Sequence, residues 1–192
     1  MGKSSYSPKG HLQIYKVYPD HSRELVWDES NTITSGMGVG LSHLFSTSGS
    51  RHIDSYQIVN FAIGVSGDLN DYGASTYKLV SPITTTQYGP NPGVNLESFY
   101  PIENGSISTN LTTFGRIKYN NIHKVNKTSV RFTIVLDQET CNTVEQLSEI
   151  GLFMRNPRGV SPESPILVAY RPFIPLTKTR DYSLIFVWTI QF

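Results

Sequence analysis

The sequence predicts an all-β protein, an antiparallel β-sandwich of the jelly-roll type with one short helix near residues 36–46 and long loops. Three observations favour this class: several short segments alternate apolar and polar residues, Gly and Pro turns separate them, and a single segment has helical spacing. The chain has 192 residues, enough to bury a core without a metal or disulfide. We expect residues 1–10 to form a flexible N-terminal arm and residues 11–192 to form one domain, with an irregular elaboration at about 66–127.

The N-terminal part of this fold begins with a predicted β-hairpin. Leu12–Tyr18 alternates apolar and polar residues and stops at Pro19, and Arg23–Trp27 follows after a short polar turn. Two such segments on either side of a turn favour antiparallel pairing, so they are expected to be neighbours in a sheet.

The segment 36–46 is the predicted helix. Its apolar residues recur at helical spacing, at Met37, Leu41, Leu44 and Phe45. Ser35 is available as the N-terminal cap. Its glycines are Gly36, Gly38 and Gly40. Because each glycine costs about 0.5–1 kcal/mol relative to Ala, we expect a short helix that depends on packing, in which the glycines let backbones approach closely.

The middle of the chain has weaker patterns. Tyr56–Ile63 predicts a buried strand that stops at Gly64. From residue 74 to 127 charges are sparse and alternation is broken, and the tract Gln87–Gly93 is incompatible with a central strand or helix. Long ordered loops in compact domains are usually functional, so we expect contacts with partners in this segment.

The last third of the chain contains the clearest strands. Residues 129–137 and 182–192 alternate apolar and polar side chains, and residues 147–155 and 166–171 flank a long turn as a hairpin would. Ile185 and Val187 interrupt the polar face of the last strand, which indicates that its centre is covered on both sides. Phe192 falls on the apolar face and is expected to be a core or interface residue.

Composition argues against several classes of partner. Charged residues make up 16% of the chain and the formal net charge is +1, whereas about 25% charged residues is usual. We therefore expect no nucleic-acid partner and no anionic membrane. The first ten residues lack the apolar stretch of a secretory signal, and no run of apolar residues is long enough to span a bilayer. The single Cys141 favours a reducing compartment.

Motifs for catalysis and metal binding are incomplete in this sequence. The segment Asp68–Gly73 has part of the spacing of a calcium loop, but Tyr72 stands at the third ligand position and Leu79 stands where the bidentate Glu should be. An Asx turn is the favoured interpretation. The five histidines are scattered, and no nucleophile motif is present. We expect no enzymatic activity, no metal and no cofactor.

Three C-terminal segments resemble the closing motifs of structural proteins in tailed bacteriophage virions. They are Leu147–Met154, Leu167–Lys178 and Leu184–Phe192, with the successive patterns E-I-G-L-F, A-x-R-x-F-x-P-x-x-K and W-T-I-x-F. Leu25–Thr34, followed by the glycine-rich segment and Asn60–Gly64, is similar to the start of such proteins. Together these segments cover about half of the chain, and the middle is unmatched.

The resemblance implies a non-enzymatic, β-rich virion subunit that acts by self-association, as a ring or trimer, and by contacts with other virion subunits, most simply in the neck or tail. It would be assembled in the host cytoplasm and located in the virion. The alternatives are a glycan- or receptor-binding module of a tail fibre and a capsid decoration protein. The low charge fraction agrees with a subunit that neighbours cover, because interface cores are depleted of charge.

Eight residues are the candidate contact residues. They are Tyr72, Tyr77, Tyr88, Phe99, Tyr100, Tyr119, Arg171 and Lys178. The aromatic residues are candidates because tyrosine brings area and a hydroxyl to interfaces, and the same rings could stack on sugars or simply cover the ends of the sandwich. Under the resemblance, Arg171 and Lys178 are expected to position loops near the last hairpin, with plain surface solvation as the alternative.

Overall fold

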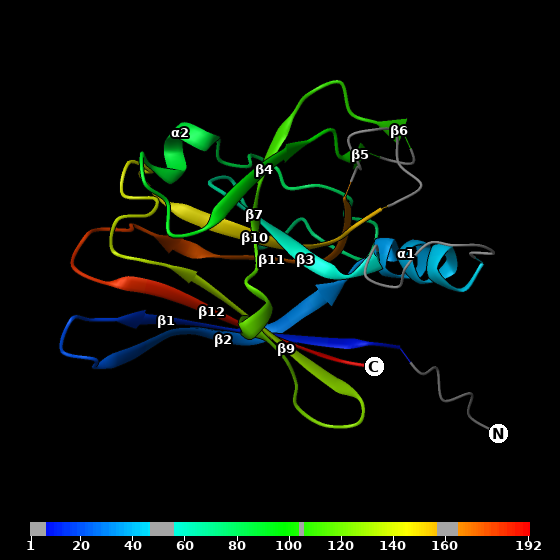
Figure 1. The fold of residues 1–192 in the computed structure, drawn as a ribbon, viewed down its shortest axis with the longest axis horizontal. Helices are drawn as coiled ribbons and strands as arrows, with labels where there is room; N and C mark the ends of the chain where they lie inside the picture. Colours follow the sequence, from blue (N-terminus) through cyan, green and yellow to red (C-terminus); the bar gives the residue numbers. More distant parts are fainter. Residues whose placement is uncertain (1–6, 47–55, 104–105, 157–164) are drawn as a thin grey trace.

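The fold is described from a computed structural model, which covers residues 7–46, 56–103, 106–156 and 165–192 (Figure 1). In chain order the elements are β1 (Lys9–Val17), β2 (Arg23–Ile33), α1 (Ser35–Phe45), β3 (Ile58–Gly64), α2 (Thr85–Tyr88), β4 (Asn95–Phe99), β5 (Ile102–Glu103), β6 (Ser106–Ile107), β7 (Thr112–Arg116), the 3-10 turn η2 (Tyr119–Asn121), β8 (Ile122–Lys124), β9 (Ser129–Leu136), β10 (Leu147–Met154), β11 (Ile166–Leu176) and β12 (Ser183–Gln191). Residues 1–6 of the expected arm lie outside the described residues, and Lys9 and Gly10 already belong to β1.

Ten of these strands form one antiparallel sheet in the order β4-β7-β3-β10-β11-β2-β1-β12-β9-β8. The sheet curls, so that the half from β4 to β11 faces the half from β1 to β8 (Figure 1). Strand β2 joins the two halves, because residues 23–31 pair with β1 while Thr32 and Ile33 pair with β11. The predicted all-β class with one short helix near 36–46 is confirmed. The structure has a single curled sheet, so the finer prediction of a jelly-roll sandwich stays a prediction.

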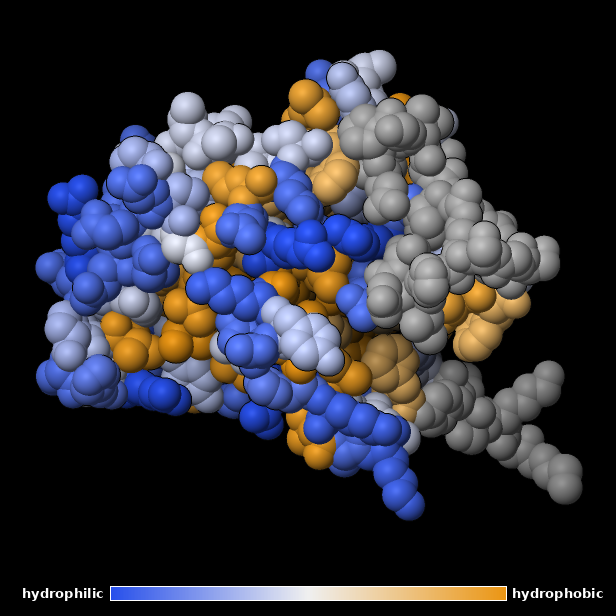
Figure 2. All heavy atoms as spheres, viewed as in Figure 1, coloured by the Kyte–Doolittle hydropathy of each residue, from blue (hydrophilic) through white to orange (hydrophobic). Residues whose placement is uncertain are grey.

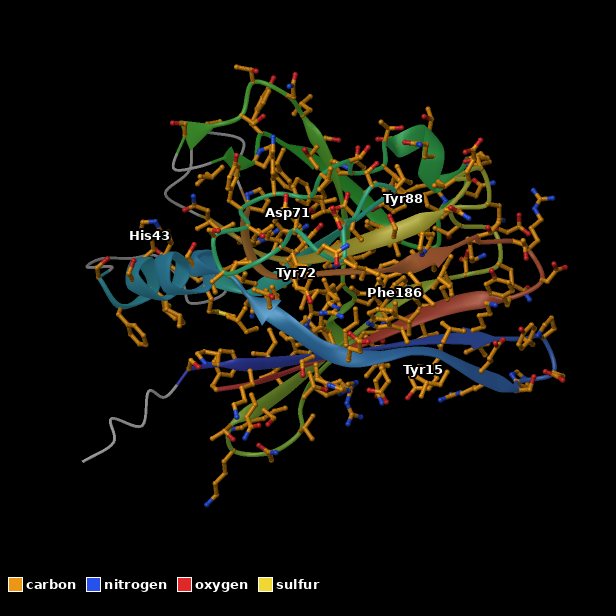
Figure 3. All side chains as sticks on the ribbon, turned by 180° about the vertical axis from the view of Figure 1, so that it is seen from behind. Tyr15, His43, Asp71, Tyr72, Tyr88 and Phe186 are labelled. Carbon is orange, nitrogen blue, oxygen red and sulfur yellow. The ribbon has the colours of Figure 1, made fainter. Side chains whose placement is uncertain are left out.

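The space between the two halves holds the main core. On β12, the side chains of Leu184, Phe186, Trp188 and Ile190 are all fully buried, as the alternation of the sequence predicts. Each such side chain contributes roughly 1.5–3 kcal/mol relative to an exposed one. Figure 3 shows Phe186 between the halves of the sheet. Phe192 is half-buried against this core.

Helix α1 packs on the end of β11 through its glycines. A Cβ atom on Gly36 would lie 2.0 Å from the Leu167 carbonyl oxygen, and one on Gly40 would lie 2.3 Å from Met154 Sδ, whereas Gly38 has nothing within 4 Å. The predicted close backbone approach is therefore confirmed at Gly36, whereas Gly40 lies against the Met154 side chain of β10. The cap residue is Thr34 rather than Ser35, and its hydroxyl donates to the Leu167 carbonyl (2.5 Å) instead of capping the helix.

The middle segment is a second layer on the outer face of the first half-sheet. Its Leu79, Phe99 and Phe114 pack with Phe153 and Tyr170 in a smaller apolar cluster outside the main core. It also supplies β4 and β7 to the sheet edge, where β7 pairs with β3. The expected irregular structure is thus wrong for β4 and β7, and the same segment also holds the short elements α2, β5, β6, η2 and β8. The tract 87–93 itself forms no strand, since α2 ends at Tyr88 and Gly89 has φ +107.

Candidate interaction surface

The outer face of the second half-sheet carries a row of apolar side chains. Leu25, Tyr15, Ile185 and Val135 occupy consecutive partner positions across β2, β1, β12 and β9. Leu25 is 48% exposed and the other three are half-buried. Figure 3 shows Tyr15 on the side of these strands away from Phe186. The predicted covering of Ile185 and Val187 on both sides is only partial, because both side chains remain half-buried.

A hollow of about 240 Å³ lies over this row. We call it the arginine socket; it is lined by Gln13, Tyr15, Val17, Arg23, Arg131, Ile185 and Val187. The lining therefore combines an apolar floor with two guanidinium groups and contains no carboxylate. Arg23 and Arg131 are both exposed, and neither has an ion-pair or hydrogen-bond partner in the described part of the chain.

Asp28, the partner of Gln13 on β2, is an acidic residue beside the socket whose carboxylate is already engaged. Asp28 accepts a hydrogen bond from Gln13 Nε2 (3.0 Å), and its other oxygen lies 2.5 Å from His11 Nε2. The bond from Gln13 and, to a smaller extent, His11 lower the pKa of Asp28. The arginine socket thus presents positive charge that its own neighbourhood does not neutralise.

The loop from Gly67 to Thr76 lies over the other half of the sheet and is fixed at Gly67 and at Tyr72. The Gly67 N–H donates to Ser148 Oγ (3.0 Å), and Arg171 Nη1 donates to the Tyr72 hydroxyl. The Arg171 guanidinium lies 5.1 Å from the centre of the Tyr72 ring and 5.2 Å from that of Trp27, and it also pairs with Glu29. Arg171 therefore holds the loop that contains Tyr72, which is not one of the loops near the last hairpin.

The loop tip, Asp68–Asp71, is exposed in all four residues. Asp68 Oδ1 accepts the Asn70 N–H at 2.8 Å, which is the Asx turn that the sequence favours over a calcium loop. Within the described residues, no group of three or more His, Cys, Asp or Glu side chains is arranged to hold a metal ion.

A buried carboxylate supports the segment that follows this loop. Glu149 is fully buried on β10 and accepts hydrogen bonds from Val80 N (2.9 Å), Ser81 N (2.7 Å) and the Tyr170 hydroxyl (2.7 Å). Burial, and after it the charge of Glu149, strongly raises the pKa of Tyr170. The hydroxyl therefore stays protonated and available as a donor.

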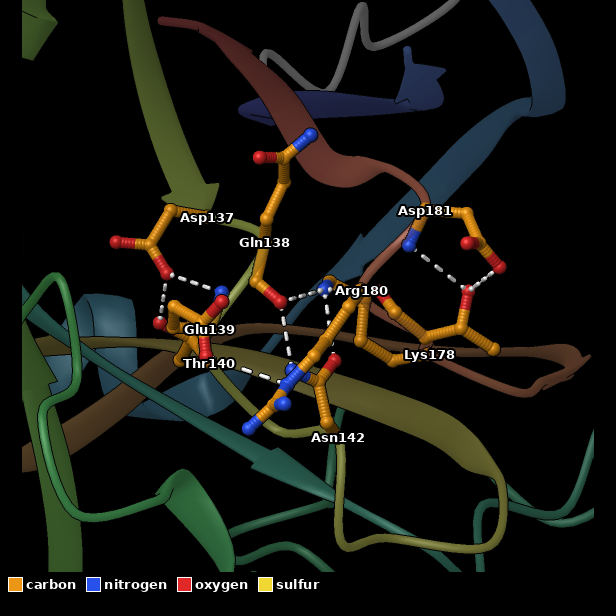
Figure 4. A network of polar contacts seen from close by, with 9 residues as sticks. Asp137, Gln138, Glu139, Thr140, Asn142, Lys178, Arg180 and Asp181 are labelled. Carbon is orange, nitrogen blue, oxygen red and sulfur yellow. Dashed lines mark hydrogen bonds and ion pairs between the residues drawn. The ribbon is translucent and has the colours of Figure 1, made fainter. Parts of the chain in front are cut away.

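Lys178 fixes the loop after β9 to the turn before β12 (Figure 4). Lys178 is only 1% exposed. Its ammonium group donates to Thr179 O (2.7 Å), Asn142 Oδ1 (3.1 Å) and Gln138 O (3.5 Å). Burial lowers the pKa of Lys178. At the exposed rim of this network, Arg180 pairs with Glu139 at 3.3 Å. Lys178 thus holds two loops together.

The candidate contact residues are dispersed, and three of them offer little surface. Tyr88 is fully buried, and Arg171 and Lys178 are 7% and 1% exposed, so each is enclosed by its own chain because it packs or bonds internally. Tyr72 and Phe99 are half-buried on the outer cluster. The exposed ones are Tyr77, Tyr100 and Tyr119, at 40%, 36% and 83%.

A second hollow, of about 250 Å³, opens between the two edges of the curled sheet. Its apolar lining includes Phe61, Val94, Ile117 and Ile134, with Asn121 of η2 beside them. Figure 2 shows apolar atoms in the middle of this face, surrounded by polar side chains. The fold therefore leaves part of its interior accessible at the open seam.

Sequence reasoning missed Arg23, Arg131 and Tyr15. Arg23 and Arg131 belong to strands far apart in the chain, and only the β2-β1-β12-β9 order brings them to one hollow. The sequence signal for this surface was the pair of apolar residues Ile185 and Val187 on the otherwise polar face of the last strand.

Comparison of the chain with known protein families, with curated proteins and with solved structures gives no match. Neither helix in the described part of the chain has the length and apolar character to cross a membrane.

Proposed function

We propose that this chain is a structural subunit of a tailed-phage virion that acts by binding copies of itself and neighbouring subunits. The observation that carries the proposal is the apolar row of Leu25, Tyr15, Ile185 and Val135 across four strands of an outer sheet face. Covering such a row is favourable, since apolar surface gains about 25 cal/mol per Å² on burial, and contiguous apolar patches commonly mark interaction sites.

The polar residues around the row support an interface. Gln13, Arg23 and Arg131 border the apolar floor, and interfaces typically have an apolar centre within a polar rim in which Arg is enriched. The C-terminal motifs that resemble phage structural proteins support this class of protein, and the resemblance implies the neck or tail as its location and a ring or trimer as its assembly. The subunit would be made in the host cytoplasm and carried in the virion.

The test is whether the chain is a component of the particle. Particles purified on a density gradient from cells that produce this chain should contain it in a fixed ratio to the major particle proteins, measured by quantitative mass spectrometry. Ile185→Lys should reduce this ratio severalfold. Ile174→Lys is the matched control, because Ile174 is a strand isoleucine, 45% exposed, outside the row. Recovery of the chain only in the free lysate fraction would overturn the proposal.

A second candidate function is a glycan- or receptor-binding module of a tail fibre. Tyr119, 83% exposed, lies in the same 3-10 turn as Asn121, which lines the hollow at the open seam. Aromatic rings beside amide groups are suited to stacking on sugar rings. Binding on a glycan array that Tyr119→Ala abolishes would support this function. Labelling of the chain on the head surface of particles would instead identify a capsid decoration protein.

A further inference from the structure

The arginine socket combines an apolar floor with two cationic groups. Its floor is formed by Tyr15, Val17, Ile185 and Val187, and its two cations are unpaired in the described part of the chain. A guanidinium group binds a carboxylate through paired hydrogen bonds, and it is more weakly hydrated than an ammonium group. The chemistry that fits the socket is therefore an apolar side chain with carboxylates on either side.

The loop tip of the same chain has this chemistry. Asp68 and Asp71 stand on either side of Leu69, which is 40% exposed, and all three side chains face solvent. No Lys or Arg occurs from residue 56 to 77, so the loop is purely acidic. Asp71 makes no ion pair in the described part of the chain, and Asp68 uses one carboxylate oxygen for the Asx turn.

The loop tip is also held in place before any partner binds. Gly67 is fixed to Ser148 and Tyr72 to Arg171, so the residues on both sides of the tip are anchored to the sheet. A preorganised loop loses less conformational entropy on binding than a loose one. Arg171 and Tyr72 are thus positioning residues for the tip, although neither reaches far into solvent.

The tip and the socket belong to different halves of the sheet. The anchors of the tip, Ser148 and Arg171, are on β10 and β11, whereas the socket lies over β1, β12 and β9. In Figure 3, Asp71 lies over the first half and Tyr15 on the outer face of the second. A contact between these two surfaces therefore joins two copies head to tail. Such a contact uses different patches on each copy and generates a closed ring or an open filament.

We propose that the loop tip of one copy docks in the arginine socket of the next, with Asp68 and Asp71 paired to Arg23 and Arg131 and Leu69 on the apolar floor. This inference rests on the proposed self-association and names the surfaces that carry it. The contact is one part of a larger interface, because a stable interface buries about 1,200–2,000 Å² in total. The apolar row beside the socket would supply further area.

The test is a charge exchange in the full chain, with association measured by sedimentation velocity over a range of protein and salt concentrations. The socket variant is Arg23→Glu with Arg131→Glu, and the tip variant is Asp68→Arg with Asp71→Arg. Each alone should weaken association at least tenfold, and an equimolar mixture should restore it, because every tip then finds a socket of opposite charge. The double variant Lys124→Glu with Lys127→Glu makes the same charge change on exposed residues outside the socket and should keep wild-type association.

The outcomes separate this inference from the proposed function. If the wild-type chain associates but the socket or tip variant stays within twofold of it, or if the mixture does not restore association, the docking of tip in socket is wrong and self-association stands. If the wild-type chain remains monomeric up to millimolar concentration and is absent from particles, both are wrong. Near-UV circular dichroism of each variant, matching that of the wild type, shows that the fold is kept.

Discussion

The guanidinium group of Arg171 lies 5.1 Å from the centre of the Tyr72 ring and donates a hydrogen bond to its hydroxyl, across 99 residues of sequence. Trp27 lies on Arg171 at 5.2 Å and Glu29 pairs with it, so one side chain of β11 joins β2 and the loop over the first half-sheet. This arrangement makes the position of the acidic loop tip depend on a single, nearly buried cation.

Replacing Arg171 should therefore loosen the loop as well as destabilise the fold. For Arg171→Met we expect a loss of about 2 kcal/mol in the free energy of unfolding, since two charge-assisted hydrogen bonds disappear while the partner Glu29 remains solvated. Urea denaturation measures the loss, and limited proteolysis should show faster cleavage within residues 66–80. Arg180→Met is the control: its pair with Glu139 is exposed, so its loss should cost less than about 1 kcal/mol. Equal effects of the two changes would contradict this role of Arg171.

Glu149 should be intolerant of a neutral isostere. Glu149→Gln replaces one of the two acceptor oxygens with an amide NH2 group, which can donate to the Tyr170 oxygen but leaves the N–H of Val80 or Ser81 without an acceptor. An unsatisfied buried polar group costs about 1–3 kcal/mol, so we expect a loss of this size by urea denaturation. Tyr170→Phe removes one donor only and should cost less. A Glu149→Gln chain as stable as the wild type would show that these bonds contribute nothing.

The sequence predicts the strands in which apolar and polar side chains alternate in step with their burial. Residues 129–136 and 183–191 alternate because one face of each strand meets the core. Strand β7 has no such alternation. Its Gly115 packs against the Phe61 ring, which a Cβ atom would meet at 2.2 Å, but a glycine in the sequence does not indicate whether it is buried or what it contacts.

The candidate site was harder to predict because its residues become neighbours only through strand order. Arg23 looks like an ordinary charged residue at the start of a hairpin strand, and Arg131 like one on the polar face of its strand. Nothing in the sequence indicates that these two arginines line one hollow, on either side of β1 and β12. Tyr88 was misleading for the opposite reason: a tyrosine among prolines and glycines suggests a surface, yet its ring fills the core.

The buried thiol should make stability fall at alkaline pH. Burial raises the pKa of Cys141 to about 12, from 9.0 for a free thiol. Because the folded chain holds this proton more tightly than the unfolded chain, the contribution is complete below pH 9 and is lost as pH rises from 9 toward 12, by about 1.4 kcal/mol per unit.

Comparison with Cys141→Ala isolates this effect from that of the other titrating groups. The difference in free energy of unfolding between wild type and Cys141→Ala, from urea denaturation at pH 8, 9, 10 and 11, should be constant up to pH 9 and then shift against the wild type. The folded thiol should also react slowly with an aromatic disulfide reagent at pH 8, since its thiolate fraction is small. A pH-independent difference would mean that the thiol ionises equally in both states.

The glycines of α1 should respond to alanine in opposite directions. Gly38 has open space around it, so Gly38→Ala should stabilise the chain by up to about 1 kcal/mol through helix propensity alone. A Cβ on Gly36 would meet the Leu167 carbonyl oxygen at 2.0 Å, and because this atom is backbone of β11, the helix must move away from the strand. Gly36→Ala should therefore destabilise the chain by about 1–3 kcal/mol.

The stability of Gly40→Ala is expected to lie between those of Gly38→Ala and Gly36→Ala. A Cβ on Gly40 would meet Met154 Sδ at 2.3 Å, and this flexible side chain can adopt another rotamer. Thermal unfolding of the three single variants under one buffer condition checks the order Gly38→Ala, Gly40→Ala, Gly36→Ala from most to least stable. If all three raised the melting temperature, α1 would not be held against β11 as closely as the backbone contact at Gly36 requires, and helix propensity alone would govern this part of the chain.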